Sequence, residues 1–222
     1  WENTHTLVGM EYSVSSAQFN SDGKKIVTAS YDYKARVFEF IGDEWKNTHI
    51  LDHIDPVRSA RFNFDGTKIV TASAAGDKTV RVWNFRNNKW TNTHTLKLAS
   101  VIRSAEFSPD GTKIITASDD STVRVFELRN NMWKNTHTLG IDDGYSFSSA
   151  RFNLDGTKIV AASDGYDTKV FEFIDNEWKN THTLIDDKGG LTSANFSFDG
   201  NKIVTTLILK EFRVWEFRNN KW

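Results

Sequence analysis

Short runs of apolar residues, each separated from the next by turn residues, recur along this chain. In one stretch the runs are Val57–Phe62, Lys68–Ser73 and Thr79–Phe85. Their length and their content of Val, Ile, Thr and Phe predict β-strands. Asp65-Gly66 stands between the first two runs. An Asp-Gly pair between apolar runs predicts a tight hairpin, because glycine accepts a positive φ without a Cβ clash.

The stretch Trp1–Leu7 alternates two sets of residues with a period of two, and it therefore predicts a further strand. Near-copies of this stretch begin at Trp45, Trp90, Trp133 and Trp178. We name the three runs of one unit strands a, b and c in chain order, and the Trp-led stretch that follows them strand d. Each unit of the chain then has four strands.

The repeat predicts an all-β fold, a five-bladed β-propeller of four-stranded antiparallel blades. Trp residues recur every 43 to 45 residues, which is the size of one four-stranded blade. Strand b is apolar without strict alternation, as in Lys68–Ser73, which is expected when both faces of a sheet are covered. Sheets stacked face to face around an axis provide that cover.

The chain begins with strand d and ends just after strand c, which predicts how the ring closes. Residues 1–7 are expected to be the outer strand of blade 5, beside its inner strands in 185–222. On this reading, deleting residues 1–7 opens the ring, and Trp222 is redundant with Trp1. The predicted single domain spans 1–222, and its other blades are 8–51, 52–96, 97–139 and 140–184.

The third unit resembles the WD-repeat (beta-transducin-like) β-propeller family, and the resemblance extends over all five units. Its Phe107–Gly111 turn is followed by Lys113–Ser118, Asp120 and Val123–Phe126, in the order of strand a, turn, strand b and strand c of that family. The resemblance implies a propeller fold and a role as a non-catalytic scaffold for protein interactions. Five blades are fewer than the usual seven of the family, so a fragment of a larger propeller stays an alternative.

The family's two signature pairs are degenerate here. The Gly-His pair before strand a is reduced to Asp52-His53, and the Trp-Asp pair after strand c becomes Trp83-Asn84, Trp215-Glu216 or Phe-Glu. The resemblance implies a hydrogen-bonded tetrad of His, Ser/Thr, Asp and Trp inside each blade. Its Asp is present at Asp32, Asp77 and Asp120, but Gly165 and Leu209 replace it in the last two blades. We therefore expect packing to hold these blades more than polar bonds do.

The composition of the chain limits the classes of partner that we expect. The chain has 28 basic and 29 acidic residues, so no global field favours nucleic acid or an anionic membrane. Cysteine is absent and no apolar run approaches the roughly 18 residues of a membrane helix. We expect a cytoplasmic protein with no nucleic-acid or membrane partner. Because residue 1 is Trp and not Met, the sequence leaves open whether a targeting segment has been removed.

The internal copies differ in length at only two connections. From the Leu that ends strand d to the Ala of strand a there are 9 to 11 residues, and from the Asp of Asp-Gly to the strand c aromatic there are 16 or 18. These are the d–a and b–c loops, which emerge at the same end of an up-and-down blade. Functional residues are concentrated in variable loops on a rigid frame, so this end is the predicted binding face.

The candidate partner-binding residues on this face are rich in aromatic and basic side chains, as interface anchors are. They are Tyr12, Tyr31, Tyr33, His53, Asp55, Arg58, Lys97, Arg103, Tyr145, Phe147, Tyr166, Asp167, Lys188 and Lys210. We interpret the chain as a scaffold that binds a protein or a peptide through these loops.

No catalytic, cofactor or metal site is predicted. Five of the six histidines occupy one repeated strand position, one per blade, and cannot converge on one ion; they are His5, His49, His94, His137 and His182. No Gly-rich phosphate loop or Gly-x-Ser-x-Gly elbow is present, and the carboxylates are turn or rim residues. The Asn-Thr-His motif of strand d is expected to pack or hydrogen-bond against the next blade.

Two further alternatives remain beside a fragment of a larger propeller. Five-bladed propellers with nearly identical blades include lectins, and the repeated Trp, Asn and His of strand d could form five equivalent glycan sites. Against this, the loop residues differ from blade to blade. The chain could also assemble with a copy of itself.

Overall fold

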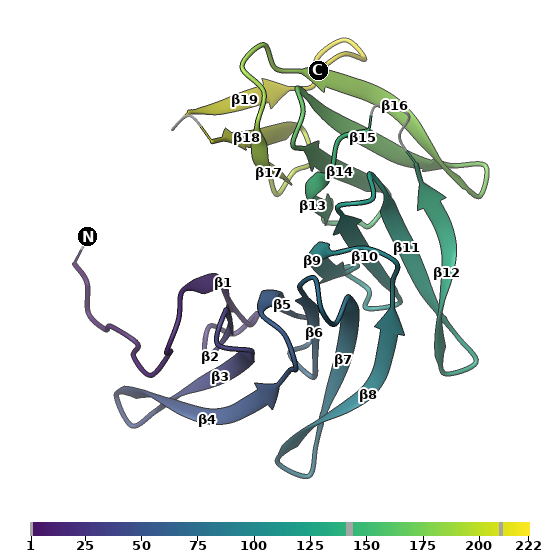
Figure 1. Ribbon diagram of the computed structural model, residues 1–222. Coiled ribbons are helices and arrows are strands. Elements are labelled where there is room, and N and C mark those ends of the chain that lie inside the picture. The colour runs from purple at the N-terminus through teal and green to yellow at the C-terminus, as the bar shows by residue number, and fades with distance from the viewer. Residues whose placement is uncertain (1, 141–143, 209–210) are drawn as a thin grey trace. The chain divides into compact units, whose positions relative to one another are not determined.

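The computed structural model describes residues 2–140, 144–208 and 211–222 (Figure 1). The chain divides into two compact units, Trp1–Leu98 and Ala99–Trp222. The described residues form nineteen β-strands in five antiparallel sheets. The predicted all-β fold of five propeller blades is confirmed, with one difference in the last blade. The described residues contain no helix long and apolar enough to cross a membrane.

The first unit holds two blades of four strands each, in the order a-b-c-d. Blade 1 consists of β1 (Val14–Phe19), β2 (Lys25–Ser30), β3 (Lys34–Ile41) and β4 (Glu44–Asp52). Blade 2 consists of β5 (Val57–Phe62), β6 (Lys68–Ser73), β7 (Thr79–Arg86) and β8 (Lys89–Lys97). The expected strands Val57–Phe62 and Lys68–Ser73 are reproduced residue for residue.

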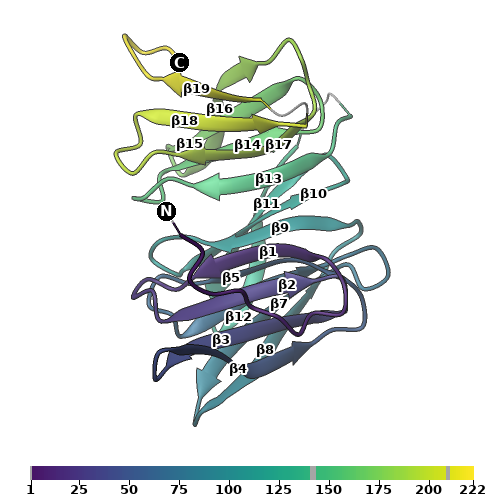
Figure 2. The same cartoon turned by 90° about the vertical axis from the view of Figure 1, so that its left-hand side faces the viewer.

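The second unit holds two further four-stranded blades and one sheet of three strands. Blade 3 consists of β9 (Ile102–Phe107), β10 (Lys113–Ser118), β11 (Val123–Arg129) and β12 (Met132–Leu139). Blade 4 consists of β13 (Phe147–Phe152), β14 (Lys158–Ser163), β15 (Asp167–Ile174) and β16 (Glu177–Ile185). Blade 5 consists of β17 (Leu191–Phe196), β18 (Lys202–Leu207) and β19 (Phe212–Glu216). Figure 2 shows the strands of each sheet running side by side.

The a–b hairpins are built as the Asp-Gly pairs predict. Each glycine of these pairs has a positive φ, from 68° to 73°. In blade 2 the Asp65 carboxylate accepts a hydrogen bond of 2.8 Å from the backbone N–H of Thr67, and Asn63 accepts one of 2.8 Å from Lys68. The Thr67 hydroxyl also donates to the Asp65 carboxylate, and this side-chain hydrogen bond is the main cause that lowers the pKa of Asp65. Side chains of the turn therefore accept hydrogen bonds from the backbone N–H groups of the same turn.

The c–d hairpins turn on two successive residues of positive φ, which is the type I′ pattern. In blade 2 these are Asn87 and Asn88, with φ of 52° and 57°. Asn populates the left-handed region more readily than other non-glycine residues do. From the strand c aromatic to the next Trp there are seven residues in every copy, and this uniform spacing follows from the two-residue turn.

The Asn-Thr-His motif forms a β-bulge in strand d. In blade 1 the pairing shifts between Val37, which faces His49, and Phe38, which faces Asn47, so Thr48 is the extra residue. Its hydroxyl donates to the Val37 carbonyl at 3.3 Å. The copies in strand d of blades 2, 3 and 4 show the same shift and the same threonine bond, at Thr93, Thr136 and Thr181.

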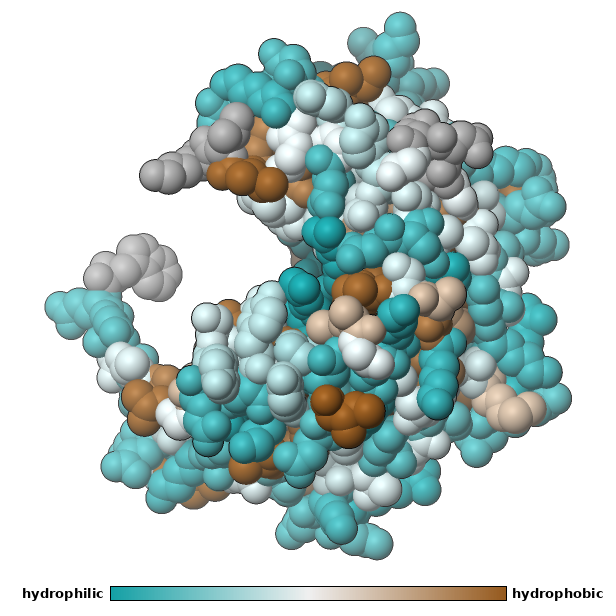
Figure 3. All heavy atoms as spheres, in the orientation of Figure 1, coloured by the Kyte–Doolittle hydropathy of each residue, from teal (hydrophilic) through white to brown (hydrophobic). Residues whose placement is uncertain are grey.

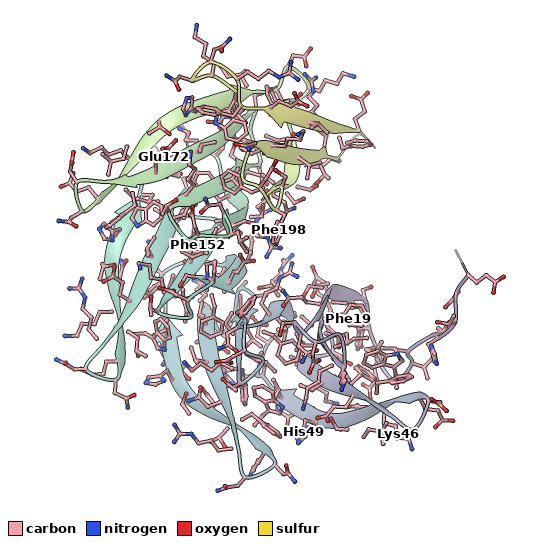
Figure 4. All side chains as sticks on the ribbon, turned by 180° about the vertical axis from the view of Figure 1, so that it is seen from behind. Phe19, Lys46, His49, Phe152, Glu172 and Phe198 are labelled. Atoms are coloured by element: carbon pink, nitrogen blue, oxygen red, sulfur yellow. The ribbon has the colours of Figure 1, made fainter. Side chains whose placement is uncertain are left out.

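The bulge aims the histidine at the next blade, as expected for this motif. The His49 ring stands edge-on to Phe85, with centroids 5.7 Å apart, and its Nε2 lies 3.1 Å from the Asn88 carbonyl oxygen. Figure 4 shows His49 on the outer strand β4, while Phe19 lies on β1. The partner that the sequence left unnamed is therefore the c–d hairpin of the following blade.

The cores lie between neighbouring blades. In the first unit, strands b and c of blade 1 present Val27 and Val37 to Val57 and Phe62 of blade 2. In the second unit, Ile115 and Val125 pack in the same way with Phe147 and Phe152. A serine of strand a reinforces each contact: the hydroxyl of Ser16 accepts from the N–H of Ala60. Ser104 and Ser149 repeat this bond to Ala150 and Ala194.

The prediction that residues 1–7 form the outer strand of blade 5 is wrong. Residues 2–10 form no strand, blade 5 has three strands, and Trp1 lies outside the described residues. The chain after β19 turns back at Asn219 and Asn220, and Arg218 bridges to Lys221. Trp222 then packs on Phe217 and Phe196, with ring centroids 5.2 and 6.2 Å apart.

That arrangement repeats blade 4, where Trp178 lies 5.2 Å from Phe173 and 6.1 Å from Phe152. Trp222 thus occupies the place expected for Trp1. The physical reason is local, because a two-residue turn closes with a far smaller loss of chain entropy than a loop of the whole chain does.

Candidate binding face on the variable loops

The d–a and b–c loops of each blade are joined by a backbone hydrogen bond. In the first unit Tyr31 N–H donates to Ser13 at 3.0 Å, and Ala74 N–H donates to Pro56 at 2.9 Å. In the second unit the donors are Asp119, Asp164 and Ile208, and the acceptors are Val101, Ser146 and Gly190. The two variable loops of a blade therefore form one surface, as their common end of the sheet predicts.

The three tyrosines of blade 1 come together on this surface. Tyr12 lies in the d–a loop, and Tyr31 and Tyr33 lie in the b–c loop. Their exposed fractions are 67%, 36% and 50%. They line a pocket of about 420 Å³ together with Glu11, Asp32 and Pro56. The sequence predicted these tyrosines and missed the other three lining residues, although Glu11 directly precedes Tyr12.

Arg58 of blade 2 contacts this cluster. Its Nη1 donates a hydrogen bond of 2.8 Å to the hydroxyl of Tyr31, and its Cζ lies 5.3 Å from the centre of that ring. Four residues of the predicted set, Tyr12, Tyr31, Tyr33 and Arg58, therefore share one part of the first unit.

A buried ion pair supports the pocket from below. Arg36 of strand c makes two hydrogen-bonded contacts with Asp32, at 2.8 and 3.0 Å, and both side chains are buried. Burial by itself raises the pKa of Asp32, but the hydrogen bonds from Arg36 and from the Glu11 N–H outweigh it and hold the pKa below its ordinary value. The Asp32 carboxylate therefore stays charged and paired.

The same pair recurs in the next two blades, where Asp77 meets Arg81 at 2.9 Å and Asp120 meets Arg124 at 2.7 Å. The expectation that packing holds these blades more than polar bonds do is thus incomplete. An arginine four residues after the Asp supplies the polar partner. In blade 2 the Trp83 Nε1 also donates to Thr71 at 3.0 Å, so part of the tetrad survives there.

His53 is not part of the exposed face. It is 8% exposed and packs on Trp83, with ring centroids 5.6 Å apart. Within the part of the chain that the structure describes, neither ring nitrogen has a hydrogen-bond partner. Burial, followed by the charge of Arg81, lowers its pKa to about 3, and the opposing effect of Asp77 is smaller. This histidine belongs to the core of blade 2.

Phe147 and two aspartates also serve the scaffold. Phe147 is fully buried in strand β13. Asp55 accepts hydrogen bonds from the N–H groups of Gly76 and Asp77 at 2.6 and 3.2 Å, which tie the two loops of blade 2 together. Asp167 accepts a bond of 2.5 Å from Ser163, as Asp77 does from Ser73. The sequence pattern did not separate these inward residues from their exposed neighbours.

In the second unit Arg103 bridges two loop carboxylates. It pairs with Asp119 and, at 3.0 Å, with Asp164. Nearby in the chain, Tyr145 and Tyr166 are 46% and 53% exposed. A Cβ added at Gly165 would lie 2.7 Å from the Tyr145 ring, and one at Gly189 would lie 2.7 Å from the Tyr166 ring. These glycines allow both rings to lie flat on the loops.

The remaining predicted residues stand apart from these groups. Lys97 is exposed at the end of β8, and the Lys188 Nζ pairs with Glu211 at 2.6 Å. Lys210 lies outside the described residues. On the face drawn in Figure 3, hydrophilic residues cover most of the surface and hydrophobic residues lie in separate patches.

The repeated strand d residues do not form open aromatic platforms. Trp90, Trp133 and Trp178 are buried, and Trp45 is partly buried. A pocket of about 660 Å³ on the outer side of blade 3 includes Asn135 and His137, but Trp133 does not line it. Within the described residues no group of three or more His, Cys, Asp or Glu side chains is arranged to hold a metal ion.

Comparison with known proteins agrees with this architecture. The β-propeller domain of Cps50 (Swd1) from Myceliophteria thermophila, known from a crystal structure, is similar with a TM-score of 0.81 and 12% identity. The match covers 97% of this chain and 68% of that one, and at this identity it shows the fold alone. No curated protein matches the chain.

The family model described as WD domain, G-beta repeat matches residues 1–39, 45–84 and 90–127, which together make up more than half of the chain. Together with the four-stranded blades, this match establishes that the chain belongs to the WD40 repeat family.

Proposed function

We propose that this chain is a non-catalytic interaction module that binds a protein or a peptide through its variable-loop face. WD40 propellers are typically scaffolds for protein interactions. The observation that carries the proposal for this chain is the gathering of Tyr12, Tyr31, Tyr33 and Arg58 around one pocket at the end of the blades where loop length varies.

The two ends of the blades differ in kind. Every a–b turn places the glycine of its Asp-Gly pair at a positive φ, and every c–d turn places two successive residues there. In the a–b turns the Asp side chain also accepts a hydrogen bond from the backbone, as Asp65 does from Thr67. The other end presents half-exposed tyrosines and arginines that change from blade to blade. Tyr and Arg are enriched among the residues that contribute most to binding, because each combines a large contact area with a hydrogen-bonding group.

A random-peptide phage library panned against the protein tests the proposal. Selected peptides are then measured on the single variants Arg58→Ala, Arg103→Ala, Tyr145→Ala and Tyr166→Ala. We expect at least one variant to weaken each peptide about five-fold or more, which corresponds to roughly 1 kcal/mol. The melting temperature of each variant should stay close to that of the wild type.

Lys24→Ala and Met132→Ala are matched controls, since both residues are exposed at the opposite, uniform end of their blades. If the peptides bind these control variants more weakly and bind all the loop variants as well as the wild type, the binding site is not on the variable-loop face. A glycan array addresses the lectin alternative: equivalent sugar binding by all blades would replace the peptide-binding proposal.

A further inference from the structure

We propose that the pocket of Tyr12, Tyr31 and Tyr33 takes a cationic side chain of the lysine type from a partner peptide. This inference rests on the proposed function, because it names the ligand chemistry of part of the same loop face. All six lining residues belong to the first unit.

The lining has the composition that attracts a cation. Three of the six residues are tyrosines and two, Glu11 and Asp32, are carboxylates, while none is basic. The face of an aromatic ring carries negative electrostatic potential, so a cation within about 6 Å of the ring centre is attracted. A pocket of about 420 Å³ accommodates an ammonium group with several methylenes.

The negative charge that the pocket offers comes from Glu11. The negative charge of Asp32 is balanced by its ion pair with Arg36 at 2.8 Å. Glu11 is exposed, and within the described residues its carboxylate has no ion pair. An exposed carboxylate beside open tyrosine rings favours a monovalent cation over a neutral or anionic side chain.

Arg58 shows that a cation sits on one of these rings already. Its Cζ lies 5.3 Å from the Tyr31 ring centre, and Tyr31 is the least exposed of the three tyrosines. This internal contact holds Tyr31 in place. Tyr12 and Tyr33, at 67% and 50% exposure, are the rings left for a ligand.

The loops that carry the rings are held in position before any ligand binds. The Tyr12 carbonyl accepts from the Ser30 hydroxyl at 3.2 Å, and the Tyr33 carbonyl accepts from the His53 N–H at 2.9 Å. The Glu11 N–H donates to Asp32 at 3.2 Å. Preorganisation of this kind reduces the entropy lost on binding.

Choline and 3,3-dimethylbutan-1-ol test the charge requirement, because they have the same shape and differ only in the positive charge. We would titrate each into protein with ring-¹³C-labelled tyrosine and follow the five tyrosine signals by NMR. Choline should shift the Tyr12, Tyr31 and Tyr33 signals in a saturable manner, with an affinity at least about three-fold higher than the alcohol. Tyr145 and Tyr166 are internal controls and should not shift.

Variants locate the contact. Tyr12→Leu and Tyr33→Leu keep an apolar side chain and remove the ring, and each should weaken choline about three-fold or more. Tyr33→Phe keeps the ring and should retain binding, whereas Lys24→Ala, at the opposite end of blade 1, should have no effect. Glu11→Gln should weaken choline without affecting the alcohol.

The outcomes separate this inference from the proposed function. Equal affinity for choline and the alcohol, or choline shifts confined to other tyrosines, would overturn the cationic pocket and leave peptide binding by the loops intact. Replacing lysine by norleucine in a selected peptide that depends on Tyr12 gives a second test. Unchanged affinity after that replacement would also overturn the inference, whereas a loss of affinity in the wild type that is absent in Tyr12→Leu supports it.

Discussion

The His5 ring stands edge-on to the ring of Phe40, with centroids 6.0 Å apart and planes at 89°. The strand d histidines His49 and His182 meet Phe85 and Phe217 in the same way, at 5.7 Å. Residues 2–7 therefore lie against blade 1 as a preceding strand d would, although they form no strand. Their local bonds are also kept, since Asn3 donates to Thr6 at 3.2 Å.

Deletion of residues 1–7 should therefore cost little stability. The stretch 2–6 is exposed, and the deletion removes the ring contact of His5 with Phe40 and the partly buried Leu7, so we expect a loss of about 1 to 2 kcal/mol. Urea unfolding of the truncated and full chains measures it. Loss of cooperative unfolding in the truncated chain would instead support the original expectation that these residues complete a blade.

His53 should make stability depend on pH. Its pKa is about 3 in the folded protein, against an ordinary value of 6.5, so only the unfolded chain gains a proton between these values. The contribution of neutral His53 to the free energy of unfolding is complete above pH 6.5. It falls as the pH is lowered toward 3, by at most about 1.4 kcal/mol per pH unit. Urea unfolding at pH 7.5, 6 and 5 should show this loss in the wild type.

His53→Phe keeps an aromatic ring against Trp83 and removes the titrating group. The difference in stability between this variant and the wild type should grow as the pH falls. Parallel curves for the two proteins would show that His53 does not remain neutral in the fold.

The Asp32–Arg36 pair should be costly to break. Arg36→Met leaves a buried carboxylate without its partner, and we expect a loss of about 3 to 5 kcal/mol. The double variant Asp32→Leu, Arg36→Met should recover part of that loss. Arg129→Met is the control, because this arginine is 59% exposed beside Glu127 and should contribute less than about 1 kcal/mol. Similar losses for Arg36→Met and Arg129→Met would contradict the role of burial.

The c–d turns should accept glycine and reject alanine. Asn88 has a φ of 57°, in the left-handed region. A residue with a Cβ is strained there unless, like Asn, it has a short polar side chain that can hydrogen-bond locally, so Asn88→Ala should cost about 1 kcal/mol. Asn88→Gly should be within about 0.5 kcal/mol of the wild type, because glycine accepts a positive φ without strain and the backbone oxygen that faces His49 is kept. Thermal unfolding compares the two variants, and equal stability would argue against the left-handed turn.

The loop end of the blades could be predicted from sequence, while its individual contacts could not. Tyr12, Tyr31 and Tyr33 stood out by their loop positions, and they do share a pocket. Phe147 and His53 have similar positions in the chain but point inward. Whether a loop side chain faces the core depends on the blade beside it, which no local pattern records.

What the sequence determined by itself is the repeat: the strands, their hairpins and the number of blades. Asp65-Gly66 and its copies suffice for the hairpins, because a tight turn and a period of two set the register between chain neighbours. Only the tertiary structure decided which distant residues meet. It paired Arg103 with Asp164, 61 residues further along the chain, and placed Arg58 on Tyr31 from the next blade. It also gave the place expected for Trp1 to Trp222, because a nearby turn delivers that ring with less loss of entropy.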